Sequence, residues 1–200
     1  MIIGLTGPYC AGKNYVSNLM ETRGFPALDV DKLGYEALEL EKNSVFAQFG
    51  DDLQKSDGSI DRRLLGQRVF GKPDKLAALE AIVHPPVDRM VDEWITKTAS
   101  PSGHYVINAA LLHRAKVFAR LDLIIFVTAP FLTRLLRARR RDKLPWKAIL
   151  KRFASQKNFN SQYLSLNAEI YRVDNSGFSK TKNRVNQIIE KIRLKEIRGE

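Results

Sequence analysis

The sequence has few of the features that mark membrane, secreted or disulfide-stabilised proteins. It contains a single cysteine, Cys10, which has no partner within the chain for a disulfide. Its longest apolar run, 121–127, is interrupted by Asp122 and is far shorter than the roughly 18 residues that a membrane span needs. The first six residues are apolar but lack the basic start of a signal peptide. We therefore expect a cytoplasmic protein with no membrane partner.

Size and charge narrow the class of protein further. The chain has 200 residues, of which 44% are hydrophobic, and this suits one α/β domain spanning residues 1–200 without a stabilising metal. The net charge of +11 favours an anionic partner, either nucleic acid or the phosphates of a nucleotide. Because the basic residues are spread over many segments without a nucleic-acid-binding motif, we expect no nucleic-acid partner. We expect a monomer or a weak homo-oligomer.

Short apolar segments alternate with segments of helical periodicity. Strands are predicted at 1–6, 25–30, 105–107, 123–127 and 169–173, with helices between them. This alternation indicates an α/β fold with a mostly parallel five-stranded sheet and helices on both faces. Residues of about 41–99 contain no strand pattern and are predicted to form a helical insertion that faces the acceptor substrate. Within the insertion, a helix is expected to stop before Pro85-Pro86 and another to follow it.

A phosphate-binding motif follows the first predicted strand. Gly7, Gly12 and Lys13 match the pattern G-x-x-x-x-G-K-[ST], and an amphipathic helix comes next. The glycines let backbone N–H groups surround phosphate, the helix N-terminus adds positive potential, and Lys13 adds a full charge. The sequence therefore predicts a P-loop NTPase fold and a kinase that binds ATP. The expected ATP-binding residues of the loop are Gly7, Cys10, Ala11, Gly12, Lys13, Asn14 and Tyr15.

The last position of the motif holds Asn14, where a hydroxyl residue normally ligates Mg²⁺. An amide oxygen is also a hard ligand, but it lies further from the backbone. Asp29 and Asp31 follow the second predicted strand, where ligands bind in open α/β sheets. In an extended segment these two carboxylates share a face. We expect Asn14 and Asp29 to hold Mg²⁺ and Asp31 to orient or deprotonate the acceptor, the alternative being that Asp31 only caps the next helix.

Arginines are concentrated near residue 137. Arg134, Arg137 and Arg141 fall on one stripe of a predicted helix, and Leu132, Leu135 and Leu136 fall on the opposite side. This pattern predicts a buried leucine face and an arginine row directed at phosphate, the alternative being a solvated basic face. We expect Arg137 to bind the nucleotide, Arg141 to act in catalysis, and residues of about 137–157 to form a lid.

Taken together, these segments resemble the dephospho-coenzyme A kinase family. The similar segments follow the family's order: Ile3 to Gly7 with Gly12-Lys13, Leu28 to Asp31, Asp57 to Arg62, Leu79 to Pro85, Leu111-Leu112, Arg141-Asp142, Ala154 to Gln156, and Val173 to Gly177. The resemblance implies transfer of phosphate from ATP, with Mg²⁺, to the ribose 3′-hydroxyl of dephospho-coenzyme A, with Asp31 as base. It also implies that Asp29, Asp31, Arg62, His84 and Leu111 bind substrate, and that Asn175 lies near the adenine.

Two alternatives remain open at this point. Fold does not determine the acceptor, so the chain could act on another nucleoside or nucleotide. Asn14 in place of a hydroxyl, and Arg114 where the family usually has glutamate, also allow a nucleotide-binding protein without turnover. Both alternatives predict ATP binding, and only an assay with a panel of acceptors separates them.

Overall fold

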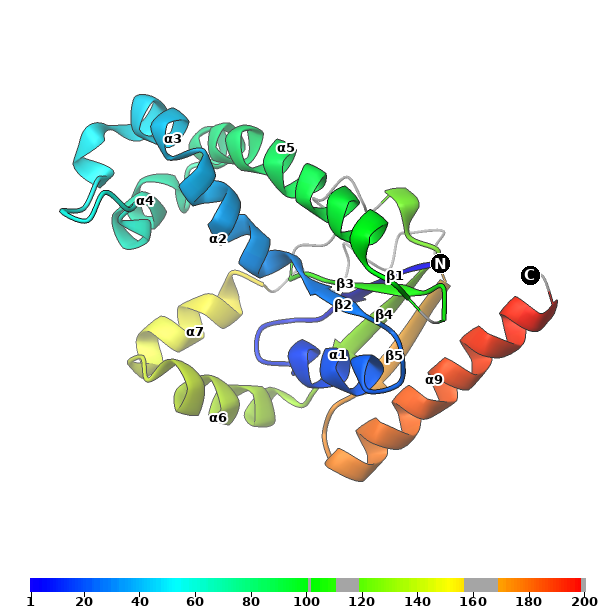
Figure 1. Ribbon diagram of the computed structural model, residues 1–200. Helices are drawn as coiled ribbons and strands as arrows, with labels where there is room; N and C mark the ends of the chain where they lie inside the picture. Colours follow the sequence, from blue (N-terminus) through cyan, green and yellow to red (C-terminus); the bar gives the residue numbers. More distant parts are fainter. Residues whose placement is uncertain (101, 111–118, 157–168, 199–200) are drawn as a thin grey trace. The chain divides into compact units, whose positions relative to one another are not determined.

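The computed structural model describes residues 1–100, 102–110, 119–156 and 169–198. The chain divides into two compact units, one formed by Met1–Leu28 with Thr98–Glu200 and the other by Asp29–Lys97 (Figure 1). Within the described ranges, no helix combines the length and the apolarity that crossing a membrane requires.

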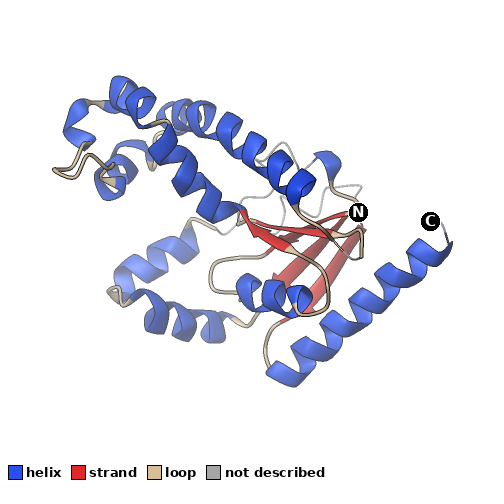
Figure 2. Ribbon diagram, viewed as in Figure 1, coloured by secondary structure: helices blue, strands red, loops and turns tan. Residues whose placement is uncertain are grey.

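The first unit is built on a five-stranded sheet, drawn in red in Figure 2. Its strands are β1 (Ile2–Thr6), β2 (Ala27–Asp29), β3 (Tyr105–Asn108), β4 (Leu123–Thr128) and β5 (Glu169–Asp174), in the order β2-β3-β1-β4-β5. Strand β1 is central and pairs in parallel with β3 and with β4, and β4 pairs in parallel with β5. The predicted α/β fold with a parallel sheet is confirmed.

Helices α1 (Lys13–Glu21) and α9 (Phe178–Arg198) contact each other beside the sheet. Their apolar residues, such as Val16 and Ile188, join Leu5, Ile125 and Val173 of the strands in one buried cluster. The strand residues that point the other way are buried as well, among them Ile107, Ile124 and Phe126. Burial on both faces explains why the strands appear in the sequence as continuous apolar runs.

Helix α6 (Phe131–Asp142) packs in the opposite sense from the one predicted. Leu132 and Leu136 are 69% and 66% exposed, whereas Arg134 and Arg137 are half-buried. The prediction of a buried leucine face is therefore wrong. The arginine side packs inward because the Arg137 guanidinium donates hydrogen bonds to the carbonyls of Ala11 and Asn175, and Arg134 donates to that of Tyr9. Helix α7 (Trp146–Ala154) follows after a short turn.

The second unit is helical. It consists of α2 (Val30–Leu40), α3 (Lys42–Phe49), a 3₁₀ turn η1 (Asp51–Leu53), α4 (Arg62–Val69) and α5 (Pro73–Lys97). Leu38, Phe46, Leu53 and Ile60 belong to its core. Asp61 caps α4, because its carboxylate accepts the N–H groups of Arg63 and Leu64 at 3.0 Å.

Helix α5 runs through Pro85 and Pro86 without interruption, so the predicted break at these prolines is wrong. Each proline removes one N–H donor from the helix interior, which normally disfavours continuation. Here Pro86, Val87 and Val91 are buried, and α5 makes extensive contacts with α2. Tertiary packing along the whole helix therefore outweighs the local cost of the prolines.

Candidate active site

The loop from Gly7 to Gly12 connects the central strand β1 to α1 and can be built only with glycine at both ends. A Cβ atom on Gly7 would lie 2.3 Å from the carbonyl oxygen of Val127, and one on Gly12 would lie 2.0 Å from the Nδ2 atom of Asn175. Gly12 also has a φ of 97°, in the left-handed region that side chains rarely adopt. These two close approaches explain the glycines of the motif.

Lys13 begins α1 directly after this loop. No side chain caps the helix, so the N–H groups of its first turn point toward the loop with the positive end of the helix dipole. The Lys13 side chain is half-buried. In the loop before it, Ala11 is buried and Cys10 has a φ of 59°. Burial raises the pKa of the Cys10 thiol. A helix N-terminus combined with a lysine at this position suits the binding of phosphate.

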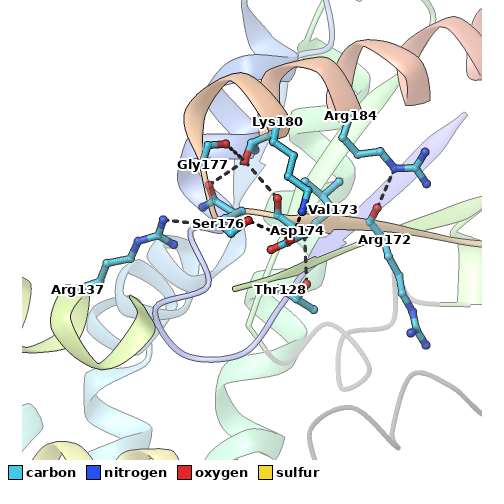
Figure 3. A network of polar contacts seen from close by, with 11 residues as sticks. Thr128, Arg137, Arg172, Val173, Asp174, Ser176, Gly177, Lys180 and Arg184 are labelled. Atoms are coloured by element: carbon cyan, nitrogen blue, oxygen red, sulfur yellow. Dashed lines mark hydrogen bonds and ion pairs between the residues drawn. The ribbon is translucent and has the colours of Figure 1, made fainter. Parts of the chain in front are cut away.

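Asn175, which directly follows β5, supports the phosphate-binding loop through its side chain. Its side chain is buried, with Nδ2 donating to the carbonyl of Ala11 at 2.8 Å and Oδ1 accepting from the Thr181 hydroxyl at 3.2 Å. Arg137 extends from α6 to the segment after β5 (Figure 3), where it donates to the Asn175 carbonyl at 2.9 Å and to that of Ala11 at 3.1 Å. Both residues were predicted to bind ATP. In the structure they frame the loop, and contact with the nucleotide stays a prediction.

The turn from β5 into α9 is fixed by a second group of polar contacts (Figure 3). The carboxylate of Asp174 accepts from Lys180 at 2.7 Å and from the Ser176 hydroxyl at 3.0 Å. The hydrogen bond from Lys180 is the largest of the effects that lower the pKa of Asp174. This turn carries Asn175, whose side chain donates to the carbonyl of Ala11 in the phosphate-binding loop.

Tyr9, at the tip of the loop, contacts the predicted lid. Its hydroxyl donates to the carboxylate of Asp142, its main-chain N–H donates to the Gln156 side chain at 2.7 Å, and its ring meets the edge of Phe153 with centroids 5.2 Å apart. Burial would raise the pKa of Asp142, but hydrogen bonds from Arg141 and Tyr9 outweigh burial and hold it below its ordinary value. The loop is thus joined to the end of α6 and to the region that follows α7.

The three arginines of the predicted stripe divide into two groups. Arg134 donates to the carbonyl of Tyr9 at 3.5 Å, and Arg137 binds the loop as described above. Arg141 instead bonds Asp142 at 2.7 Å, with its guanidinium 5.2 Å from the centre of the Tyr9 ring. The hydrogen bond to Asp142 raises the pKa of Arg141. Arg141 is therefore engaged with Asp142 and with Tyr9 at the loop tip, and its catalytic role stays a prediction.

We expect Tyr9→Phe to destabilise this contact without removing it. The substitution deletes the hydroxyl that bonds Asp142 and keeps the ring against Phe153. The expected loss is about 1 kcal/mol in the free energy of unfolding, or roughly 2–4 °C in Tm. The matched control is Tyr35→Phe, because the Tyr35 hydroxyl makes no hydrogen bond recorded within the described residues and its side chain is exposed. Equal Tm values for both variants would contradict the proposed contribution of the Tyr9 hydroxyl.

Asp29 and Asp31 lie at the start of the second unit. Asp29 ends β2 and is the N-cap of α2, although its side chain makes no capping hydrogen bond, and Asp31 is exposed in the first turn of α2. The argument that both carboxylates share one face of an extended segment is wrong, because the chain has already turned into a helix at Val30. Asp31 is also not the cap residue. Their roles in metal binding and as a base stay predictions.

The other predicted substrate-binding residues also belong to the second unit or fall outside the described residues. Arg62 begins α4 and places its guanidinium 4.8 Å from the centre of the Tyr35 ring. His84 is half-buried in α5. Leu111 lies outside the described residues. Tyr15, predicted to touch the nucleotide, is in α1 with its ring edge against Phe178.

Asn108, the last residue of β3, was not predicted from the sequence. Its side chain is buried, and its Nδ2 atom donates to the Oδ1 atom of Asn14 at 3.1 Å. Within the part of the chain that the structure describes, no group of three or more His, Cys, Asp and Glu residues forms a candidate metal cluster. The available signal was a polar residue at the end of an apolar strand, beside the strand that leads into the loop.

A central parallel strand, a glycine-bounded loop and a helix that begins with lysine define a P-loop nucleotide-binding protein. Comparison with known proteins specifies the family. The family model described as "Dephospho-CoA kinase" matches residues 1–179, and the chain belongs to this family.

Named relatives agree with this assignment, and a solved structure shares the fold. The chain is 32% identical to the dephospho-CoA kinase of Treponema denticola over 88% of this chain and 82% of that protein. It is 31% identical to the enzyme of the same name from Carboxydothermus hydrogenoformans, over 98% and 96% of the two chains. A crystal structure of a Thermus thermophilus protein superposes with a TM-score of 0.83 at 29% identity, covering 94% of this chain and 95% of that one.

Proposed function

We propose that this protein transfers the γ-phosphoryl group of ATP to the ribose 3′-hydroxyl of dephospho-coenzyme A. The observation that carries the proposal is the phosphate-binding loop, held between β1 and α1 in a chain that matches the family along residues 1–179. The names of the two kinase relatives support the same acceptor.

The loop and Lys13 are proposed to bind the β- and γ-phosphates. Main-chain N–H groups at the start of α1 donate to phosphate oxygens, and the Lys13 ammonium offsets the charge that develops during transfer. Asp31 is proposed to accept the proton of the 3′-hydroxyl as its oxygen attacks the γ-phosphorus, while the bond to the β-phosphate oxygen breaks and ADP leaves. The assignment of Asp31 rests on its position after β2 and on the family resemblance.

Asn14 and Asp29 are proposed to hold Mg²⁺, and Asn108 lies hydrogen-bonded to the Asn14 amide. The fit of Asn14 rests on the chemistry of the site, since an amide oxygen is a hard ligand and the buried Asn108 amide beside it has an Oδ1 atom without a hydrogen-bond partner among the described residues. When bound, Mg²⁺ would neutralise charge on the β- and γ-phosphates.

The proposed setting is the cytoplasm, with a monomer or a weak homo-oligomer acting on a small molecule. No nucleic-acid partner is proposed. Support for this setting comes from the sequence, whose single cysteine fits a reducing compartment.

An acceptor panel tests the proposed function. The protein is incubated with ATP and Mg²⁺ and, in separate reactions, with dephospho-coenzyme A, nucleosides and nucleoside monophosphates, and the products are separated by chromatography. We expect ADP and a phosphorylated product only with dephospho-coenzyme A. Transfer to a nucleoside or a nucleotide instead would identify a different kinase. ATP binding without transfer to any acceptor would identify a binding protein without turnover, the alternative that Asn14 favours.

A further inference from the structure

Two asparagines meet where the phosphate-binding loop enters α1. Asn14 is the second residue of α1, next to Lys13, and Asn108 ends β3, the strand that pairs with β1. The Nδ2 atom of Asn108 donates to the Oδ1 atom of Asn14 at 3.1 Å. Asn108 is 2% exposed, so this hydrogen bond is shielded from water on its strand side.

P-loop NTPases normally hold their metal between a hydroxyl of the loop and a carboxylate from another strand. In that arrangement the hydroxyl is the donor and the carboxylate carries a negative charge. Here both side chains are neutral amides, and the direction of the hydrogen bond is reversed, since the buried strand residue is the donor.

The amide pair leaves oxygen atoms available to a cation. The Oδ1 atom of Asn14 has two lone pairs, of which Asn108 uses one. The Oδ1 atom of Asn108 is buried and has no hydrogen-bond partner among the described residues. A buried amide oxygen without a partner is costly, and a ligand that it contacts removes that cost.

We propose that Asn108 is a positioning residue that directs the Asn14 amide oxygen to the Mg²⁺ of bound nucleotide, so that the two amides act as one neutral unit. The inference rests on the proposed function in so far as ATP must bind at the loop. Because neither amide is charged, this half of the site contributes dipoles and no net charge. Loss of either amide should therefore remove the same contribution to ATP affinity in the presence of Mg²⁺, and loss of both amides should remove no more.

The test is a double-substitution cycle on ATP affinity, measured by calorimetry with Mg²⁺ and again with EDTA. The variants are Asn14→Ala, Asn108→Ala and the double substitution, with Asn18→Ala as control because Asn18 is exposed one turn further along α1. The quantity compared is the gain in ATP affinity when Mg²⁺ is present. We expect this gain to be about five- to tenfold smaller in each single variant, and no smaller in the double variant than in one single variant. In the control the gain should be the same as in the wild type. Affinity in EDTA should be unchanged in all four.

Several results would overturn the inference. One is a double variant whose loss of ATP affinity is the product of the two single losses, and another is a loss in Asn14→Ala without one in Asn108→Ala. The others are losses of ATP affinity that are equally large in EDTA, and a wild-type ATP affinity that does not depend on Mg²⁺. Failure of the proposed function is seen separately, either as absence of ATP binding in EDTA by the wild type or as absence of transfer in the acceptor panel.

A measurement on the wild-type protein covers the case in which Asn108→Ala does not fold. In protein labelled with ¹⁵N at asparagine, the side-chain NH₂ signals of Asn14 and Asn108 should both shift when Mg²⁺ is added to the ATP complex. The corresponding signal of Asn18 should not move. A shift of the Asn14 signal without one at Asn108 would contradict the coupling.

Discussion

Lys13→Ala is expected to lower kcat for phosphoryl transfer by about 10²- to 10³-fold, the usual cost of removing one preorganised group that stabilises developing charge. Lys13 is the first residue of α1, directly after Gly12, and its ammonium is the full positive charge that the loop motif provides for the β- and γ-phosphates. The effect should be larger on kcat than on binding of the acceptor, because the charge is needed most as the phosphoryl group is transferred.

The matched control for this substitution is Lys182→Ala, which removes the same charge from an exposed position on α9. The measurement is initial rates of ADP formation with dephospho-coenzyme A for the wild type and both variants, together with their Tm values. The control should be indistinguishable from the wild type. Activity of Lys13→Ala within threefold of the wild type, with Tm unchanged, would refute the assignment of the loop as the phosphate site.

Features that depend on neighbouring residues were predicted well from the sequence. The strands β1 and β4 are continuous apolar runs, and the loop motif lies between a strand and a helix that its neighbouring residues specify. The Asp61 cap is likewise a local signal. In each case the physical cause lies within a few residues, so the sequence contains it.

Features that depend on tertiary contacts were not predictable in the same way. Helical periodicity showed that Arg134 and Arg137 share a face, but it could not show which face of α6 packs inward. The answer depends on the carbonyl groups of Tyr9 and Ala11, more than 120 residues earlier, which accept the guanidinium hydrogen bonds. The continuity of α5 through its prolines depends in the same way on packing against α2.

The residues of the candidate active site also divide into those that a local sequence pattern identifies and those that only tertiary contacts reveal. The loop residues were identified because a motif names them, whereas Asn108 belongs to no motif and becomes visible only when β3 is paired with β1. Asn175 was chosen for a contact with the nucleotide through the family resemblance. The structure adds a role in supporting the loop, which no sequence pattern indicates. The Asn175 side chain donates to the Ala11 carbonyl and accepts from the Thr181 hydroxyl.

Asp31→Asn is expected to lower kcat by about 10²- to 10⁴-fold, the usual cost of losing a general base, with a much smaller change in KM for ATP. The substitution preserves the size of the side chain and removes only its ability to accept a proton as an anion. Asp31 is exposed in the first turn of α2, where its charge also interacts with the helix dipole. That interaction is worth only about 0.3–1 kcal/mol of stability, so the variant should remain folded.

The pH dependence of kcat separates a base from a structural carboxylate. In the wild type, kcat should fall at low pH as Asp31 is protonated, and in Asp31→Asn this acidic limb should be absent. Glu36→Gln is the matched control, because Glu36 is an exposed carboxylate on the same helix, and it should retain both the rate and the limb. Asp29→Asn should instead raise the Mg²⁺ concentration needed for half-maximal rate. If Asp31→Asn changes only the affinity for ATP or Mg²⁺ and leaves kcat intact, Asp31 binds metal or supports α2, and the proton of the acceptor hydroxyl must go to another group.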